Sequence, residues 1–347
     1  MMQRLISVVV LAGCLAWPAA AAAQAPADPL HAAAAWMRTQ QQPDGGFSNG
    51  FVPGSDAATT ADAVLGIVAA GEDPSEWNAG GSSPMDLLRV AVSSGSVVGP
   101  GAFAKVTLAV VAAGDEPRDF GGVDLVGKIL QGYSSDAGMF GGGPYDSALA
   151  IQALAAAGEP LPEGAIAGLL ATRLADATYS FNGDQALGAG DSNTTAMAVM
   201  ALIAAGERDD VAPSLAYFRS VQNEDGGWTY QKPSAFGEDT DANSTALVLQ
   251  ALAAAGEDLA AWNDPAQALL ALQLPSGAFI FNAANSSENL LATVQALPAL
   301  ALVMPSEVTS AHPPWTVIGL VGIGVVIVGI LVWRVLRKGR AGDSAGK

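Results

Sequence analysis

Residues 222–228 read Gln-Asn-Glu-Asp-Gly-Gly-Trp, and two other stretches repeat this phrase with small changes. They are Gln-Gln-Pro-Asp-Gly-Gly-Phe at 41–47 and Gln-Leu-Pro-Ser-Gly-Ala-Phe at 273–279. A second phrase, Ala-Ala-Gly followed by an acid, recurs at intervals of 43 to 50 residues, with its glycine at Gly71, Gly114, Gly158, Gly206 and Gly256. An internal period of this length in an alanine-rich sequence predicts stacked helical hairpins.

Each repeat divides into a first helix, a glycine-aromatic loop and a second helix that ends at Ala-Ala-Gly. We expect the first helices at 28–42, 84–94, 122–132, 162–174, 210–222 and 264–273. The second helices are expected at 57–70, 103–113, 144–157, 191–205, 241–255 and 288–303. Three of the second helices are preceded by pairs of capping residues, Ser192/Asn193, Asn243/Ser244 and Ser286/Ser287. The second helices are apolar all round and the first are amphipathic, which predicts an all-α, closed (α/α)6 toroid with the second helices inside.

The two ends of the chain differ from the repeats. Residues 1–25 have a basic start, an apolar centre and a small-residue end, which predicts a secretory signal peptide. An alternative is lipoprotein processing at Cys14, because Leu-Ala-Gly-Cys at 11–14 resembles a bacterial lipobox. Residues 315–333 form an uncharged run flanked by tryptophans, which predicts a C-terminal transmembrane helix.

The basic residues that follow this run favour a cytoplasmic tail at 334–347, after a juxtamembrane linker at 305–314. The sequence thus predicts a single-pass protein of a bacterial-type cell membrane, with an extracellular toroid over 28–304. Six of the fifteen Lys and Arg lie in the predicted signal peptide and cytoplasmic tail. The predicted extracellular part therefore carries nine basic and thirty-two acidic residues. Such a surface disfavours nucleic acid as a partner. Cys14 is the only cysteine, so packing has to hold the fold without disulfides.

The repeated phrases and the helix start Asp-Ala-Asn-Ser-Thr-Ala at 241–246 resemble the prenyltransferase/squalene-cyclase repeat superfamily. This group includes terpene cyclases, protein prenyltransferases, thioester domains and the α-domain of cobalamin carriers. The resemblance is strong in three repeats, degenerate at Phe140 and Phe181, and eroded in the second repeat. It implies that Phe47, Trp228 and Phe279 pack between neighbouring hairpins and that the phrase glutamine joins helix end to loop.

This sequence lacks the residues that the best-understood reactions of this superfamily require. Where the resemblance places the acid of class II terpene cyclases, this chain has Ser244, or Thr194 in the preceding repeat, and neither can protonate an alkene. The histidines are His31 and His312, so no prenyltransferase zinc site is expected. A Cys-Gly-Glu-Gln thioester sequence is absent. We therefore assign no catalytic residue, no metal ligand and no cofactor.

The starts of the inner helices are expected to ring one mouth of the central cavity. Polar residues gather there, and the candidate ligand-binding residues are Asp56, Asp146, Asp191, Asn193, Asp239, Asp241, Asn243 and Glu288. Helix capping alone also accounts for residues of these types at these positions. Two further alternatives are a calcium loop beginning at Asp239 and a glycosidase or lyase site with paired carboxylates.

Two functional hypotheses follow. The first is a non-catalytic, membrane-anchored extracellular module that captures a small molecule or a protein partner, with a cobalamin-like or isoprenoid-like ligand implied by the resemblance. The second is a terpene-cyclase-like or prenyltransferase-like enzyme that uses a non-standard acid.

Overall fold

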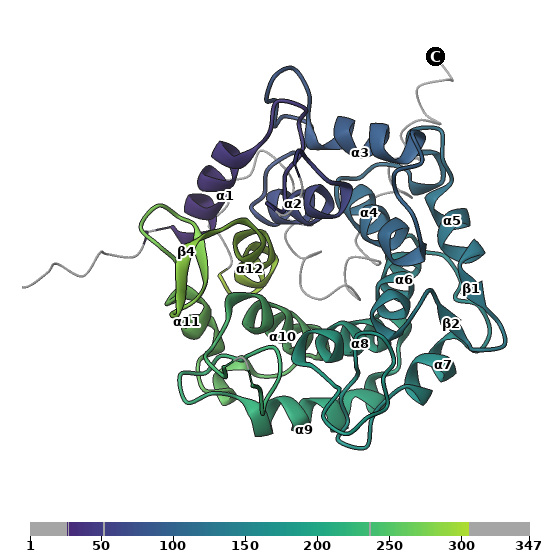
Figure 1. The fold of residues 1–347 in the computed structure, drawn as a ribbon, viewed down its shortest axis with the longest axis vertical. Helices are drawn as coiled ribbons and strands as arrows, with labels where there is room; N and C mark the ends of the chain where they lie inside the picture. The colour runs from purple at the N-terminus through teal and green to yellow at the C-terminus, as the bar shows by residue number, and fades with distance from the viewer. Residues whose placement is uncertain (1–25, 27, 51–52, 236, 305–347) are drawn as a thin grey trace, which may run out of the picture.

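The computed structural model describes residues 26, 28–50, 53–235 and 237–304. In this part of the chain two concentric layers of helices surround a central axis (Figure 1). The inner helices are α2 (Ala57–Ala69), α4 (Pro100–Ala112), α6 (Pro144–Ala156), α8 (Ser192–Ala205), α10 (Ala242–Ala255) and α12 (Leu290–Val303). The outer helices are α1 (Pro29–Gln40), α3 (Pro84–Ser93), α5 (Leu125–Gln131), α7 (Ala165–Ala171), α9 (Ala212–Val221) and α11 (Pro265–Leu270). The Ala-Ala-Gly helices therefore form the inside of the ring.

The chain is not entirely helical, in contrast to the prediction. Two short antiparallel ribbons occur in the loops, β1 (Tyr133–Ser134) with β2 (Met139–Phe140) and β3 (Phe279–Asn282) with β4 (Asn285–Asn289). Single turns of 3-10 helix lie at Pro117–Asp119, Arg208–Val211 and Leu259–Ala261. The helix expected from residue 288 begins after β4, because Asn289 rather than Ser286/Ser287 accepts the first free N–H.

The ring is closed by contacts between the two ends of the repeat array. Each inner helix packs against the next, and α12 packs against α2. The first outer helix, α1, packs on α12, so the start of the chain covers its last hairpin. The Gln273 amide donates to the carbonyl oxygen of Pro29 at 2.8 Å. Closure leaves no inner helix with an uncovered flank.

The phrase glutamine joins the end of an outer helix to the loop that follows. Gln41, Gln222 and Gln273 each donate from the side-chain amide to the carbonyl oxygen four residues later, at 2.8, 2.7 and 3.0 Å. The phrase aromatics Phe47, Trp228 and Phe279 are fully buried. Each donates its backbone N–H to a threonine hydroxyl in the first turn of the next inner helix, namely Thr60, Thr245 and Thr293.

The assignment of Phe181 to the phrase is wrong. Phe181 is 57% exposed, whereas Tyr179, two residues earlier, is fully buried. The backbone N–H of Tyr179 donates to the Thr195 hydroxyl at 3.0 Å, as in the other repeats. Phe140 fits the pattern, because it is buried and its N–H donates to Ser147 at 2.9 Å. In an extended segment a shift of two residues keeps the same face, so periodicity could not separate Tyr179 from Phe181.

The Ala-Ala-Gly-acid phrase ends the inner helices and ties them to the outer layer. Its five glycines have positive φ, between 73° and 92°, which is the left-handed conformation expected of helix terminators. In four of the five repeats the acid that follows accepts a hydrogen bond from an arginine or a tryptophan. Glu159, for example, accepts two from Arg118 at 2.7 Å, and Glu257 accepts one from the Trp262 indole at 3.1 Å. These contacts give the acids a structural role.

The predicted signal peptide, linker, transmembrane helix and tail lie outside the described residues. Among the helices that the structure describes, none is long and apolar enough to cross a membrane.

Candidate binding site at the mouth of the ring

Aspartates cap three of the inner helices at one end of the ring. The carboxylates of Asp56, Asp191 and Asp241 each accept the backbone N–H three residues later, at 2.7–2.8 Å. Each also accepts the hydroxyl of that same residue at 2.8 Å. The caps expected at Ser192/Asn193 and Asn243/Ser244 therefore belong to the aspartates just before them, because an aspartate on extended backbone reaches the third N–H.

Two of these caps are almost completely buried. Asp191 is 1% exposed and Asp241 is 2% exposed. Burial raises the pKa of both carboxyl groups, although their cap hydrogen bonds act in the opposite direction. Tyr230 lies close to both, since its hydroxyl lowers the pKa of the Asp191 carboxyl and its backbone N–H lowers that of Asp241. Its carbonyl oxygen also accepts from Ser192 at 2.8 Å, so α8 and α10 share one polar network.

A cavity of about 670 Å³ opens beside this network at the starts of α8, α10 and α12. Asn243 donates to Gln295 across it at 2.7 Å, which joins α10 to α12. The lining residues come from the starts of three inner helices, the β3–β4 ribbon, α1 and the loops after α1 and α9. They are Trp36, Gln40, Ser48, Asn49, Gly50, Asn193, Tyr230, Asp241, Asn243, Ser244, Phe281, Glu288, Asn289, Leu290, Leu291 and Gln295.

The structure brings half of the candidate residues to this cavity. Asn193, Asp241, Asn243 and Glu288 line it. Asp191 lies beside it, joined through Tyr230, but is not part of the lining.

The other candidates lie elsewhere. Asp56 caps α2, and Asp146 accepts the Gly142 N–H at 3.3 Å in the first turn of α6. Asp239 is exposed in the loop before α10 and lines no part of the cavity. Nothing in this arrangement supports the calcium alternative: within residues 26, 28–50, 53–235 and 237–304, no three His, Cys, Asp or Glu side chains are grouped to hold a metal ion.

Several lining residues are absent from the sequence-based list, above all the aromatics. Tyr230 and Phe281 each lie two residues after a buried phrase aromatic, in the same register as Phe181. An aromatic-x-aromatic pattern in the sequence therefore marks these two lining residues. Trp36 belongs to an outer helix and reaches the cavity because α1 packs on α12.

A charged pair lies in the part of the mouth formed by α2, α4 and α6. Lys105 of α4 donates to Asp62 of α2 at 3.0 Å, and both side chains are largely buried. Although burial by itself lowers the pKa of Lys105, the Asp62 carboxylate, Tyr145 and Asp56 raise it above its usual value. Lys105 therefore stays protonated, and its charge is neutralised by Asp62.

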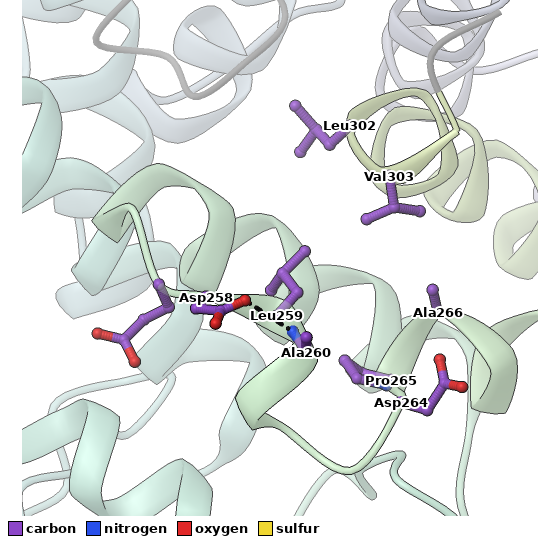
Figure 2. Close-up of a pocket in the computed structure, with 9 residues that line it drawn as sticks. Asp258, Leu259, Ala260, Asp264, Pro265, Ala266, Leu302 and Val303 are labelled. Carbon is purple, nitrogen blue, oxygen red and sulfur yellow. Dashed lines mark hydrogen bonds between the residues drawn. The ribbon is translucent and has the colours of Figure 1, made fainter.

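A second cavity, of about 640 Å³, lies at the opposite end of the ring, where the inner helices finish. Figure 2 shows Leu302 and Val303 at the end of α12 facing Leu259 and Ala266 across it. The Asp258 carboxylate accepts the Ala260 N–H at 3.1 Å. The Glu257 and Asp258 carboxylates of this cavity thus accept hydrogen bonds from within the fold.

No family model matches this sequence, and no curated protein matches it significantly. Solved structures do match. A protein from Actinoplanes has a TM-score of 0.59 at 16% identity, over 78% of this chain and 97% of that one. A type II terpene cyclase from Scytonema has a TM-score of 0.55 at 13% identity, over 78% and 95% of the two chains. An unsaturated glucuronyl hydrolase specific for heparin has a TM-score of 0.57 at 10% identity, over 81% and 98%.

These neighbours have different activities, and identities this low establish a shared fold alone. The likeness covers the twelve-helix ring rather than any one site. The chain therefore has an α/α toroid fold, which it shares with these solved structures.

Proposed function

We propose that this protein is a membrane-anchored extracellular module that captures a small molecule in the mouth cavity without transforming it. The observation that supports this proposal is the cavity itself, whose volume of about 670 Å³ lies within the range of small-molecule sites. Its polar groups Asn193, Asn243 and Gln295 converge from three inner helices. Amides in a mainly apolar wall orient a ligand but supply no acid or nucleophile.

The nature of the buried carboxyl also favours binding over catalysis. Asp241 already accepts hydrogen bonds from the Ser244 N–H and hydroxyl, at 2.7 and 2.8 Å. Ser244, which occupies the expected position of the cyclase acid, is buried and donates to Asp241.

The anchor predicted from the sequence supports a particular orientation. The described chain leaves the ring after Val303, at the end opposite the mouth cavity. An anchor at 315–333 would hold that end toward the bilayer and leave the mouth facing outward.

Native mass spectrometry of the full-length protein, purified from its own host, tests the capture of a ligand. We expect a bound molecule on the wild type and reduced occupancy in the double variant Asn243→Ala/Gln295→Ala, which removes both members of one hydrogen-bonded pair. Gln250→Ala is the matched control, because Gln250 lies two turns further along α10 and outside the cavity lining. Equal occupancy in all three proteins would contradict a ligand site at the mouth.

An enzyme with a non-standard acid is the second candidate, favoured by the raised pKa of Asp241 at the cavity wall. A Scytonema cyclase of the same fold was solved with geranylgeranyl dihydroxybenzoate as substrate. Incubation with geranylgeranyl compounds, followed by product analysis, tests this candidate. A product made by the wild type and lost in Asp241→Asn would establish the enzyme and overturn capture without reaction.

A protein partner is the third candidate, favoured by apolar side chains around the mouth. Five of the large apolar side chains that the structure describes as exposed lie just before or at the start of inner helices: Val98, Phe181, Leu187, Tyr230 and Leu291. Exposed apolar groups gathered on one face are typical of interaction surfaces. Leu187→Ser should then weaken association with a partner isolated from the host surface, whereas Val90→Ser on α3 should leave it unchanged.

A further inference from the structure

The charged side chains that line the mouth cavity are both acidic. They are Asp241 and Glu288, and no lysine, arginine or histidine is among the described residues of the lining. Lys105 lies across the ring on α4 (Figure 1), where Asp62 neutralises it. Asp191 adds a further carboxylate just behind the wall. The cavity thus carries an uncompensated negative potential, which favours a positively charged ligand.

Aromatic rings line the same cavity from separate elements. Tyr230 and Phe281 occupy equivalent positions in neighbouring hairpins, two residues beyond Trp228 and Phe279. The first aromatic of each pair is fully buried, whereas the second lines the mouth cavity. Trp36 contributes a third ring from α1. The face of an aromatic ring attracts a cation, so rings and carboxylates act in the same direction.

One buried oxygen atom at the cavity has no hydrogen-bond donor among the described residues. The Asn193 side-chain oxygen is buried and has no hydrogen-bond partner in the described structure. Burial and the nearby Asp191 carboxylate raise the pKa of Tyr230 to about 12, so its hydroxyl keeps its proton. A ligand that brings N–H donors would complement this wall, whereas a carboxylate or phosphate would face oxygen atoms.

We propose that the molecule bound in the mouth cavity is an organic ammonium ion with an apolar body. The ammonium group lies toward Asp241 and Glu288, and the apolar body packs among the aromatic rings and the leucines at the start of α12. This inference rests on the proposed function, since it names the class of ligand for the same site.

Isothermal titration of the full-length protein in neutral detergent tests the charge requirement. The probes are 2-phenylethylammonium, benzyltrimethylammonium, 2-phenylethanol and phenylacetate, which share one ring and differ in charge. We expect both cations to bind at least about tenfold more tightly than the alcohol, as one charge-assisted contact implies, and phenylacetate not to bind. Benzyltrimethylammonium has no N–H, so its binding reports the aromatic and electrostatic contribution alone.

Variants locate the effect. Glu288→Gln should weaken binding of both cations about tenfold while leaving the alcohol unchanged. Glu76→Gln, which removes one negative charge from an exposed loop outside the cavity lining, should leave all affinities unchanged.

Binding of the alcohol as tight as that of the cations, or binding of none of the four probes, would overturn the ammonium assignment. So would a neutral or anionic molecule found by native mass spectrometry and lost in Asn243→Ala/Gln295→Ala, but that result would leave the proposed capture function standing. Capture itself fails only if no bound molecule depends on the cavity residues.

Discussion

Replacing Thr245 by valine should destabilise the protein through one buried hydrogen bond. Thr245 is completely buried in the first turn of α10, and its hydroxyl accepts the Trp228 backbone N–H at 3.0 Å. The same contact recurs in four other hairpins, so it is the bond that joins each glycine-aromatic loop to its inner helix. Valine has nearly the same shape as threonine but has no acceptor.

The variant leaves the Trp228 N–H buried without a partner, which costs about 1–3 kcal/mol. Urea unfolding followed by tryptophan fluorescence should therefore show a lower midpoint with an unchanged slope. Thr245→Ser keeps the acceptor and loses one methyl group, which costs about 1 kcal/mol. It should therefore be destabilised less than Thr245→Val. Thr60→Val tests the equivalent bond of the first hairpin, and its effect should add to that of Thr245→Val because they lie in different repeats.

Two results would refute this reasoning. One is a valine variant as stable as the wild type, which would mean that the Trp228 N–H finds another acceptor or that the bond contributes nothing. The other is a serine variant less stable than the valine variant, which would show that the methyl group rather than the hydroxyl carries the effect.

Three further predictions concern buried charge and the corrected aromatic position. Burial raises the pKa of Asp241 above its ordinary value of 3.8, so its contribution to stability is greatest below pH 3.8 and declines as pH rises through the folded-state pKa. The urea midpoint of Asp241→Asn relative to wild type should therefore increase between pH 4 and 7, and a difference that does not change with pH would contradict this. Lys105→Met should cost about 3–5 kcal/mol in urea unfolding because it strands a largely buried Asp62 carboxylate, and the double variant Lys105→Met/Asp62→Leu should recover most of it; no recovery would show that the pair is not the cause. Tyr179→Ala should cost about 3–5 kcal/mol of stability as a core truncation, whereas Phe181→Ala should change the thermal midpoint little. A larger loss of stability in Phe181→Ala than in Tyr179→Ala would show that Phe181 is the buried aromatic of this repeat.

Most of the fold could be predicted because its determinants are local and repeated. The 43–50-residue period sets the number of hairpins, and the glycines after Ala-Ala end the helices by adopting positive φ. The inner helices were recognisable from their apolar surface on all sides. The helices expected from 191 and 241 begin one residue later, whereas those expected from 103, 122 and 162 begin at Pro100, Leu125 and Ala165. The β3–β4 ribbon was missed, since five polar residues at 285–289 carry no strand pattern.

The composition of the site depended much more on the tertiary structure. The sequence by itself determined that polar side chains gather at the starts of the inner helices, because capping requires them there. Only the tertiary structure decided which of them face a common cavity. Stacking of α12 on α10 brings Gln295 to Asn243, fifty-two residues apart, and ring closure brings Trp36 of the first helix to the same cavity as Phe281 of the last ribbon. Contacts between residues so far apart follow from how the hairpins stack and where the ring shuts, and local sequence patterns carry no record of that geometry.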